Sequence, residues 1–450
     1  GDVMDIRAPA PLGWFGIVRL GLVQTALGAI VVLTTSTMNR VMVVELQLAA
    51  MLPGALVAWH YGVQMLRPRL GYGSDIGGRR TPWIIGGMFV LGLGGVGAAM
   101  ATALMETNVL LGSALAVLAF LAIGVGVGAS GTSLLVLLAK RTADVRRPAA
   151  ATIVWIMMIG GFVVTALTAG HFLDPYSSAR LVAVTASVAV IALVVTVLAV
   201  WRVEGPASEE RVEGTTAKPS FREALREVWS EDKARRFTIF VFVSMLAYSA
   251  QDLILEPFAG TVFGMTPGQS TQLAGVQNGG VMLGMILVAI CGSVIGGRVL
   301  GNLAMWTVGG CIASALALTL IAIGGLYGPG WPLKASVFAL GFSNGVFAVA
   351  AIGSMMRLVG QGRQSREGVR MGLWGAAQAI AFGLGGFLGT VAIDVTRLVW
   401  DLPEVAYGIV FCGEGLMFLV SAVLAARVGH TPPAVSESGH GGIASMPAAS

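Results

Sequence analysis

Twelve apolar runs, each long enough to cross a lipid bilayer as a helix, follow one another through this 450-residue sequence. In lipid every backbone N–H and C=O must find its partner within the chain, so each run predicts a transmembrane helix and the fold class is an all-α membrane protein. Charged residues make up 11% of the chain, against about 25% in a soluble domain, which argues against a soluble enzyme, a secreted disulfide scaffold or a nucleic-acid binder. The predicted spans are 17–38, 46–66, 83–104, 109–139, 149–170, 181–201, 237–257, 271–296, 303–326, 335–355, 372–393 and 404–426.

The basic residues between these runs predict the orientation of the chain in the membrane. Of the 28 Lys and Arg residues, 24 fall in segments on the same side as both termini, and four fall on the opposite side. Because Lys and Arg are retained on the cytoplasmic side, both termini are expected to be cytoplasmic in a multi-pass protein.

A long polar segment divides the spans into two sets of six. The predicted units are an N-terminal bundle (1–201), a cytoplasmic linker (202–236), a C-terminal bundle (237–427) and a disordered tail (428–450). Within the linker, Ser220 and Glu223 form a capping-box pattern, and the apolar residues that follow lie on one helix face. This predicts a short amphipathic helix that lies on the membrane surface or braces the two halves; the alternative is a solvated linker helix.

An internal repeat relates the two sets of spans. The segment GSDIGGR at 73–79 recurs as GSVIGGR at 292–298, an offset of 219 positions, and the same offset carries Arg147 onto Arg366 and Trp155 onto Trp374. This indicates duplication of a six-helix unit. Since six is even, the two copies have the same orientation, and the halves are expected to be parallel repeats related by an axis along the membrane normal.

The first copy of the repeat resembles the cytoplasmic loop motif of the major facilitator superfamily. The matching positions in GYGSDIGGRR are Gly71, Asp75, Gly78, Arg79 and Arg80. The resemblance implies that superfamily's fold and a latch in which the acid and the arginines hold neighbouring helices together. The sequence departs from the motif at Ile76, where a basic residue is usual, and Val294 replaces the acid in the second copy, so the second latch is expected to be lost.

A narrower resemblance covers nearly the whole chain. The segments TMNRVMVVEL (37–46), RPRLGYGSD (67–75) and GVGVGASGTSLLVLLAKR (124–141) are similar to those of PucC/LhaA-type proteins, the bacteriochlorophyll delivery branch of the superfamily. The resemblance implies an assembly factor in the intracytoplasmic photosynthetic (inner) membrane of a phototrophic bacterium. It further implies bacteriochlorophyll or a precursor as bound pigment, and antenna subunits, reaction-centre subunits or pigment-synthesis enzymes as partners. A longer basic insertion typical of the 75–81 region is missing, which indicates a paralogue.

Ionisable residues within spans are costly and are therefore functional candidates. Asp252 and Glu256 are four residues apart on one helix face. Their mutual repulsion either raises the pKa of one acid, as a proton-coupled transporter would require, or both lie near the outer end of the span, wet or paired with Arg40 or Arg397. Glu414 is a third intramembrane acid.

Asn39, Arg40 and Glu45 are expected around a short turn after the first span. There Asn39 and Arg40 either satisfy the terminal carbonyls of the helix or, by the resemblance, contribute to a rim that faces pigment or a partner.

Three further residues are candidate pigment contacts. His60 lies within the second span and is either an axial ligand to the pigment magnesium or a hydrogen-bonding residue between helices. Trp155 and Trp374 are possible stacking partners for a planar macrocycle, or packing residues of the fold. The 63 glycines similarly favour close helix packing.

The sequence carries no nucleotide-binding loop in the required strand context, no Ser/His/Asp or HExxH arrangement, and no cysteine spacing typical of a metal site. We therefore expect no enzyme, no nucleotide cofactor and no protein-bound metal. Two alternatives to pigment delivery remain open from the sequence: a proton-coupled transporter of a small amphiphile that uses Asp252 and Glu256, and a pigment-free scaffold for antenna subunits.

Overall fold

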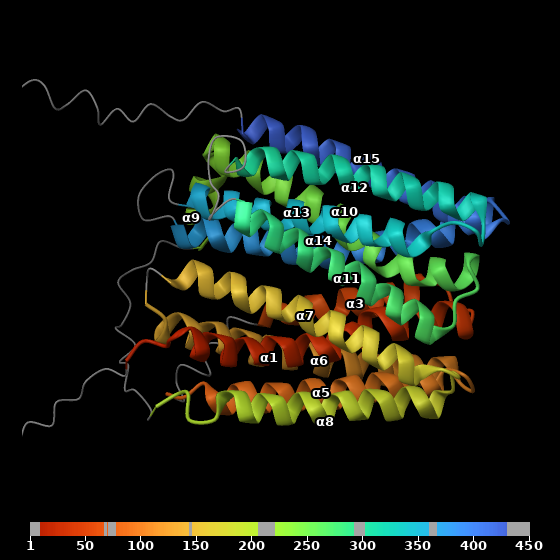
Figure 1. Ribbon diagram of the computed structural model, residues 1–450, viewed down its shortest axis with the longest axis horizontal. Coiled ribbons are helices and arrows are strands. Elements are labelled where there is room, and N and C mark those ends of the chain that lie inside the picture. The colour runs from red at the N-terminus through yellow and green to blue at the C-terminus, as the bar shows by residue number, and fades with distance from the viewer. Residues whose placement is uncertain are drawn as a thin grey trace, which may run out of the picture.

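The computed structural model describes residues 10–66, 70, 78–143, 146–205, 221–291, 302–359 and 367–429, and this part of the chain contains helices and no strands (Figure 1). Within these described ranges, eleven helices are long and apolar enough to cross a membrane. In the N-terminal half the elements are α1 (Trp14–Val32), η1 (Leu33–Thr37), α2 (Met38–Arg40), η2 (Val41–Glu45), α3 (Met51–Val63), η3 (Gln64–Leu66), α5 (Thr81–Leu104), α6 (Val109–Arg141), α7 (Arg147–Leu173) and α8 (Ser178–Val200). The C-terminal half contains α9 (Phe221–Ser230), α10 (Asp232–Val262), α11 (Pro267–Ile290), α12 (Leu303–Tyr327), α13 (Leu333–Val359), α14 (Glu367–Val399) and α15 (Pro403–Gly429).

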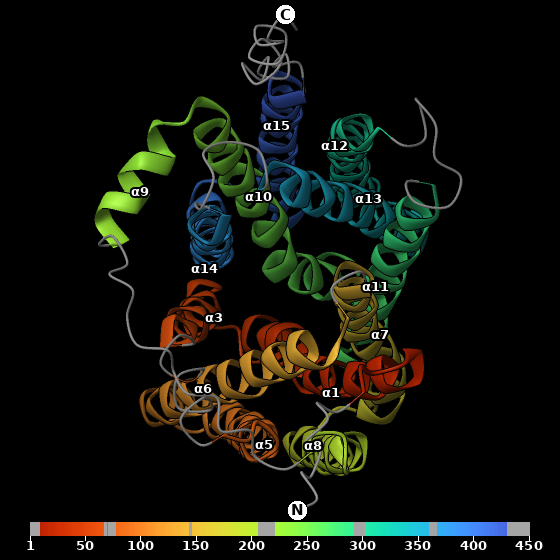
Figure 2. The ribbon, with the colours of Figure 1, turned by 90° about the vertical axis from the view of Figure 1, so that its left-hand side faces the viewer.

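The helices form two bundles that stand side by side. Seen along the helices, α1 to α8 occupy one side and α10 to α15 the other, with α7 beside α11 and α3 beside α14 where the halves meet (Figure 2). Each half buries its own large apolar core. The predicted all-α fold with two parallel six-helix sets is confirmed. We call the end of the bundles that holds α9 and residues 201–205 the terminal end, and the opposite end the distal end.

The first helix is longer than the sequence predicted. It runs without interruption from Trp14 to Glu45, because two π-helical segments, η1 and η2, continue it where a turn was expected. The prediction of a turn beside Arg40 was therefore wrong. The chain turns later, around Gln47, which has a φ of 53°. The second span consequently begins at Met51 and not at residue 46, and α3 with η3 is too short to count among the eleven long helices.

The linker contains the predicted amphipathic helix. Helix α9 contacts α10 and α14 at the terminal end, with Val228 buried in the core of the C-terminal half and Trp229 exposed. Residues 206–220 of the linker and the tail from residue 430 lie outside the described residues.

Glycines bring neighbouring helices close, as the packing interpretation predicted. A Cβ atom at Gly385 or Gly389 of α14 would lie 2.6 or 2.7 Å from carbonyl oxygens of α10, which is closer than side-chain atoms approach. These positions therefore serve helix contact.

Candidate functional site

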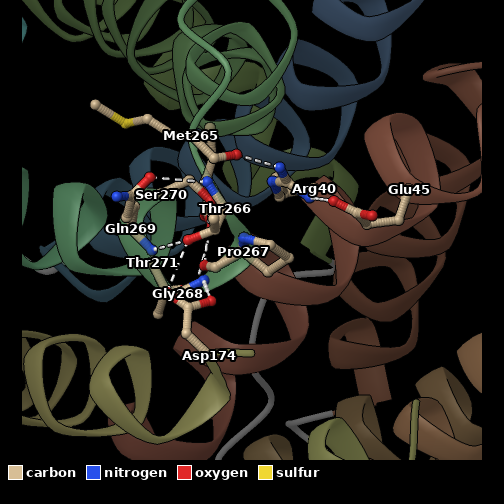
Figure 3. Close-up of polar contacts among 11 residues, drawn as sticks. Arg40, Glu45, Asp174, Met265, Thr266, Pro267, Gly268, Gln269, Ser270 and Thr271 are labelled. Atoms are coloured by element: carbon tan, nitrogen blue, oxygen red, sulfur yellow. Dashed lines mark hydrogen bonds and ion pairs between the residues drawn. The ribbon is translucent and has the colours of Figure 1, made fainter. Parts of the chain in front are cut away.

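Polar residues of both halves meet at the distal end, at the level of Arg40 (Figure 3). Arg40 is 2% exposed, and its guanidinium donates hydrogen bonds to the Met265 carbonyl oxygen of the other half and to the Glu45 carboxylate. We refer to Arg40, Glu45, Asp174, Met265, Thr266 and Gly268 as the distal seal. Because a buried guanidinium must have acceptors, the carbonyl of Met265 fixes the first helix against the loop before α11.

Asp174, directly after α7, caps the N-terminus of α11 in the other half. Its carboxylate oxygens accept hydrogen bonds from Thr266 Oγ1 at 2.7 Å and from the Gly268 backbone N–H at 3.1 Å (Figure 3). A carboxylate is favoured there because the first N–H groups of a helix lack partners and carry partial positive charge. A Cβ atom at Gly268 would lie 2.4 Å from Asp174 Oδ2, so only glycine permits this approach.

Asp394 in the last turns of α14 makes the reciprocal cap on the N-terminal half. Its carboxylate oxygens accept hydrogen bonds from the backbone N–H groups of Ala50 at 3.0 Å and Met51 at 2.9 Å, at the start of α3. Asp174 and Asp394 are 220 positions apart, one more than the repeat offset of 219. The two caps are therefore repeat-related: each half places an acid at the end of its fifth span to cap the second span of the other half.

Beneath the seal, further polar contacts join the first helix to α10 and α11. Asn39 Nδ2 donates to the Leu253 carbonyl oxygen at 2.8 Å, and the Thr37 and Thr271 hydroxyls lie 2.8 Å apart. The prediction that Asn39 and Arg40 satisfy the end of their own helix was wrong, because the helix continues and both side chains donate across the interface between the halves.

Glu256 is buried, contrary to the interpretation that it lies wet near the outer end of its span. Its side chain is 4% exposed, and Oε1 accepts from Ser270 Oγ at 3.1 Å and Thr271 Oγ1 at 3.2 Å. Its environment therefore differs from that of Asp252, four residues earlier, which is exposed to a cavity. The sequence correctly placed both acids on one helix but did not separate their surroundings.

Tyr176, in the short segment between α7 and α8 beside Asp174, contributes no charge to this end of the molecule. Burial raises the pKa of its hydroxyl above the usual value.

A cavity of about 300 Å³ lies between the halves, on the terminal side of the seal. Helices α1, α3 and α7 line it from one half, and α10, α11, α13 and α14 from the other. Its wall contains aromatic rings, among them Trp155, together with Asp252 and the amides of Gln277, Asn278 and Gln378. Trp155 thus faces the interior space, as a residue that contacts a ligand would.

A second, larger hollow of about 950 Å³ lies on the outer face of the N-terminal half, lined by α1, α7 and α8. Its lining is apolar and rich in alanine, with hydroxyl groups and a single Arg180 near the distal end. We call it the lateral groove. Val164 and Ile191 in its lining are more than 60% exposed, so the groove opens on the surface that a transmembrane protein presents to lipid.

The other residues predicted as pigment contacts lie away from both hollows. His60 is 2% exposed; its Nδ1 lies 3.1 Å from the Val57 carbonyl oxygen and its Nε2 lies 2.9 Å from Gln64 Nε2. Trp374 is 1% exposed, and its Nε1 donates to Thr238 Oγ1 at 3.0 Å within the C-terminal core. These contacts of His60 lie within its own segment, α3 and η3, whereas that of Trp374 joins α14 to α10.

Glu414 of α15 is 4% exposed, and neither carboxylate oxygen has a hydrogen-bond partner among the described residues. It lies within electrostatic range of Asp252. The sequence identified it as an intramembrane acid, and it is not among the described residues that line the central cavity.

The loop motif is only partly described. Gly71 and Asp75 lie outside the described residues, whereas Gly78 has a φ of 72°, the left-handed conformation that glycine permits. Arg79 is exposed and Arg80 is buried. The backbone N–H groups of Arg80 and Thr81 donate to the Glu204 carboxylate at 2.7 and 2.6 Å, so Glu204 caps α5. This acid, which follows the last span of the first half, was not among the residues predicted from the sequence.

The family model and the sequence relatives that match this chain agree with one another. The PUCC protein family model matches residues 37–432. The chain is 55% identical to the "Bacteriochlorophyll synthase 44.5 kDa chain" of Rhodobacter capsulatus, over 93% of this chain and 96% of that one. It is 30% identical to the "Protein PucC" of Cereibacter sphaeroides, over 91% of each.

Among solved structures, the chain resembles a crystal structure of a mutant of the nucleoside transporter NupG. The TM-score is 0.70 at 13% sequence identity, with 92% of this chain and 99% of the transporter covered. At this identity the likeness concerns the fold alone, and it supports the major facilitator superfamily fold predicted from the loop motif.

Proposed function

Because this chain belongs to the PucC family, we propose that it is an assembly factor that binds bacteriochlorophyll, or a late precursor, and delivers it for the biogenesis of photosynthetic complexes. The observation that carries the proposal is the 55% identity, over nearly the full length of both chains, to a relative whose name refers to bacteriochlorophyll. In this proposal the protein lies in the inner, intracytoplasmic photosynthetic membrane with its terminal end in the cytoplasm. Its partners are antenna or reaction-centre subunits and pigment-synthesis enzymes.

We place the pigment in the lateral groove because of its size and its position. Pockets for small-molecule ligands enclose roughly 300–1,000 Å³, and the groove, at about 950 Å³, is near the upper end of this range. The central cavity, at about 300 Å³, is near the lower end. A pigment dissolved in the bilayer can enter a groove on the lipid-facing surface sideways, without passing the distal seal.

The chemistry of the groove suits a planar apolar ring that must later be released. Alanines such as Ala26, Ala29 and Ala183 leave a smooth floor, and the aliphatic walls bury the faces of the ring. The described lining contains no histidine, so the magnesium would be held by a weaker hydroxyl or water ligand. Arg180 can hydrogen-bond a carbonyl group of the pigment at the distal end of the groove.

Weak ligation fits a carrier better than a permanent pigment protein. The cargo is retained by shape and apolar burial, and a receiving subunit that offers a stronger axial ligand can withdraw it. This makes the protein a carrier and not a catalyst, although the name of the relative in Rhodobacter capsulatus contains the word synthase.

The test is to purify the full chain in mild detergent from pigment-making cells and to record its near-infrared absorption. The proposal expects a bound bacteriochlorin band and, in cells that lack the gene, reduced levels of antenna or reaction-centre complexes. A preparation that never carries pigment, from cells in which deletion leaves these complexes unchanged, contradicts the proposal. Antenna polypeptides cross-linked to a pigment-free protein would instead favour a scaffold.

A further inference from the structure

Asp252 is the one charged side chain among the described residues that line the central cavity. Its hydrogen-bond contact is with Gln277, whose Nε2 lies 3.5 Å from Asp252 Oδ1, and this neutral amide cannot balance a negative charge. An intramembrane carboxylate is costly unless it is paired, so this one requires a cationic partner or a proton.

Arg40, the described cation within electrostatic range of Glu256, is already paired. Arg40 donates to Glu45 and to the Met265 carbonyl oxygen within the distal seal. Glu256, whose carboxylate accepts from Ser270, is a second acid, and Glu414, within electrostatic range of Asp252, is a third. Among these described residues, acidic groups therefore outnumber basic ones.

Aromatic rings line the same cavity as this carboxylate. Tyr61 and Phe382 stack across the interface between the halves with ring centroids 5.9 Å apart, and Tyr248 meets Phe382 edge-on at 6.0 Å. Trp155 and Phe162 extend the wall from α7. Faces of aromatic rings attract cations, most strongly those of tryptophan, and a carboxylate among aromatic rings recognises an organic cation.

We propose that the central cavity binds a small organic monocation, with Asp252 as its counter-ion and Trp155 and neighbouring rings as its walls. The amides of Gln277, Asn278 and Gln378 provide hydrogen bonds for polar substituents of the ligand. A divalent metal fits less well, because hard cations require six or more oxygen ligands and the described residues contain no metal-binding cluster. A tetrapyrrole is too large for about 300 Å³.

This site is separate from the lateral groove, although α7 contributes to both. Trp155, Met158 and Phe162 face the cavity, whereas Gly161 and Val164 face the groove. The inference does not depend on pigment binding, and the two are tested by different measurements.

The test is isothermal titration calorimetry of the full chain in mild detergent, with benzyltrimethylammonium as the probe and its uncharged isostere neopentylbenzene as the control ligand. We expect saturable binding of the cation and much weaker binding of the isostere. Asp252→Asn is expected to weaken cation binding by about 30-fold or more, and Trp155→Leu by about 2- to 30-fold. Asp401→Asn, which removes an exposed acid outside the cavity, should bind as the wild type does.

Absence of saturable binding to the wild-type protein would overturn the proposal. So would equal affinity for the cation and its isostere, a comparison that requires no variant and holds even if Asp252→Asn fails to fold. Undiminished binding by a folded Asp252→Asn variant would also overturn it and would indicate that a proton balances this carboxylate. The near-infrared spectrum of the same preparations reports pigment binding independently.

Discussion

The reciprocal caps at the distal end lead to a quantitative prediction. Asp174 and Asp394 each accept two hydrogen bonds from the other half at the N-terminus of a helix. Replacing both by Asn keeps the size of the side chains but removes their charges. We expect the double variant to favour separation of the halves at this end.

The magnitude follows from the contacts at each site. An Asn retains one acceptor oxygen, so each substitution loses one charge-assisted hydrogen bond, worth about 1.5–3 kcal/mol, and a helix-dipole interaction worth about 0.3–1 kcal/mol. Both acids are half-buried, so solvent screening reduces the loss to roughly 1–2 kcal/mol per site. The sites share no partner, so their effects should add to about 2–4 kcal/mol, or a roughly 30- to 1,000-fold shift in the equilibrium between closed and open states.

The assay is double electron–electron resonance on protein reconstituted in lipid bilayers. Spin labels at Thr107→Cys and Leu402→Cys report from exposed distal positions, one in each half, after the native cysteines have been replaced. The double variant should show a new population at longer distance, and each single variant a smaller one.

The matched control is Asp401→Asn, which removes an exposed acid at the same end that caps no helix of the other half in the described structure. It should leave the distance distribution unchanged. If the double variant gives the distribution of the wild type, or if the control opens the distal end as far, the two caps do not hold the halves together and the reasoning fails.

Two further predictions concern packing and are measured as thermal unfolding of the purified protein. Gly268→Ala should lower the free energy of unfolding by about 1–3 kcal/mol, because its Cβ would meet the carboxylate of Asp174 at 2.4 Å, whereas Gly279→Ala on the same helix has open space around its Cβ and should be neutral or slightly stabilising; equal effects would refute the close approach. Trp374→Phe should cost about 1 kcal/mol or more through loss of its indole hydrogen bond to α10, and Trp155→Phe, at the edge of the cavity, should cost less than about 0.5 kcal/mol; the reverse order would show that the repeat-related tryptophans have exchanged roles.

The sequence predicted the fold because hydropathy determines which segments are apolar enough to cross the membrane as helices. It failed at the first helix, where a basic residue within an apolar run indicated a turn. Arg40 instead remains helical, because the Met265 carbonyl and Glu45 satisfy its guanidinium inside the protein. Met265 lies more than 200 positions from Arg40 in the sequence, so no local pattern identifies it as the partner.

The candidate site was predictable in composition but not in arrangement. Asp252, Glu256 and Glu414 were identified because an ionisable residue within a membrane span costs free energy. The contacts that give each acid its own surroundings depend on the packing of distant helices, which no local pattern predicts. One feature of the sequence did indicate the two helix caps. Asp174 and Asp394 are 220 positions apart, close to the repeat offset of 219, so a comparison of the acidic residues in the two copies would have found them. No sequence pattern indicated the lateral groove, because its shape depends on how α1, α7 and α8 pack against one another.

The most direct test of the central claim measures bacteriochlorophyll bound per protein after the lateral groove has been filled. Ala183→Trp places an indole in the groove, and Ala339→Trp places one on an exposed position of α13 in the other half. Both variants are purified from pigment-making cells beside the wild type, and the near-infrared band is divided by the protein concentration. We predict a large loss of pigment from Ala183→Trp and wild-type content in Ala339→Trp; equal pigment content in all three proteins would contradict the account.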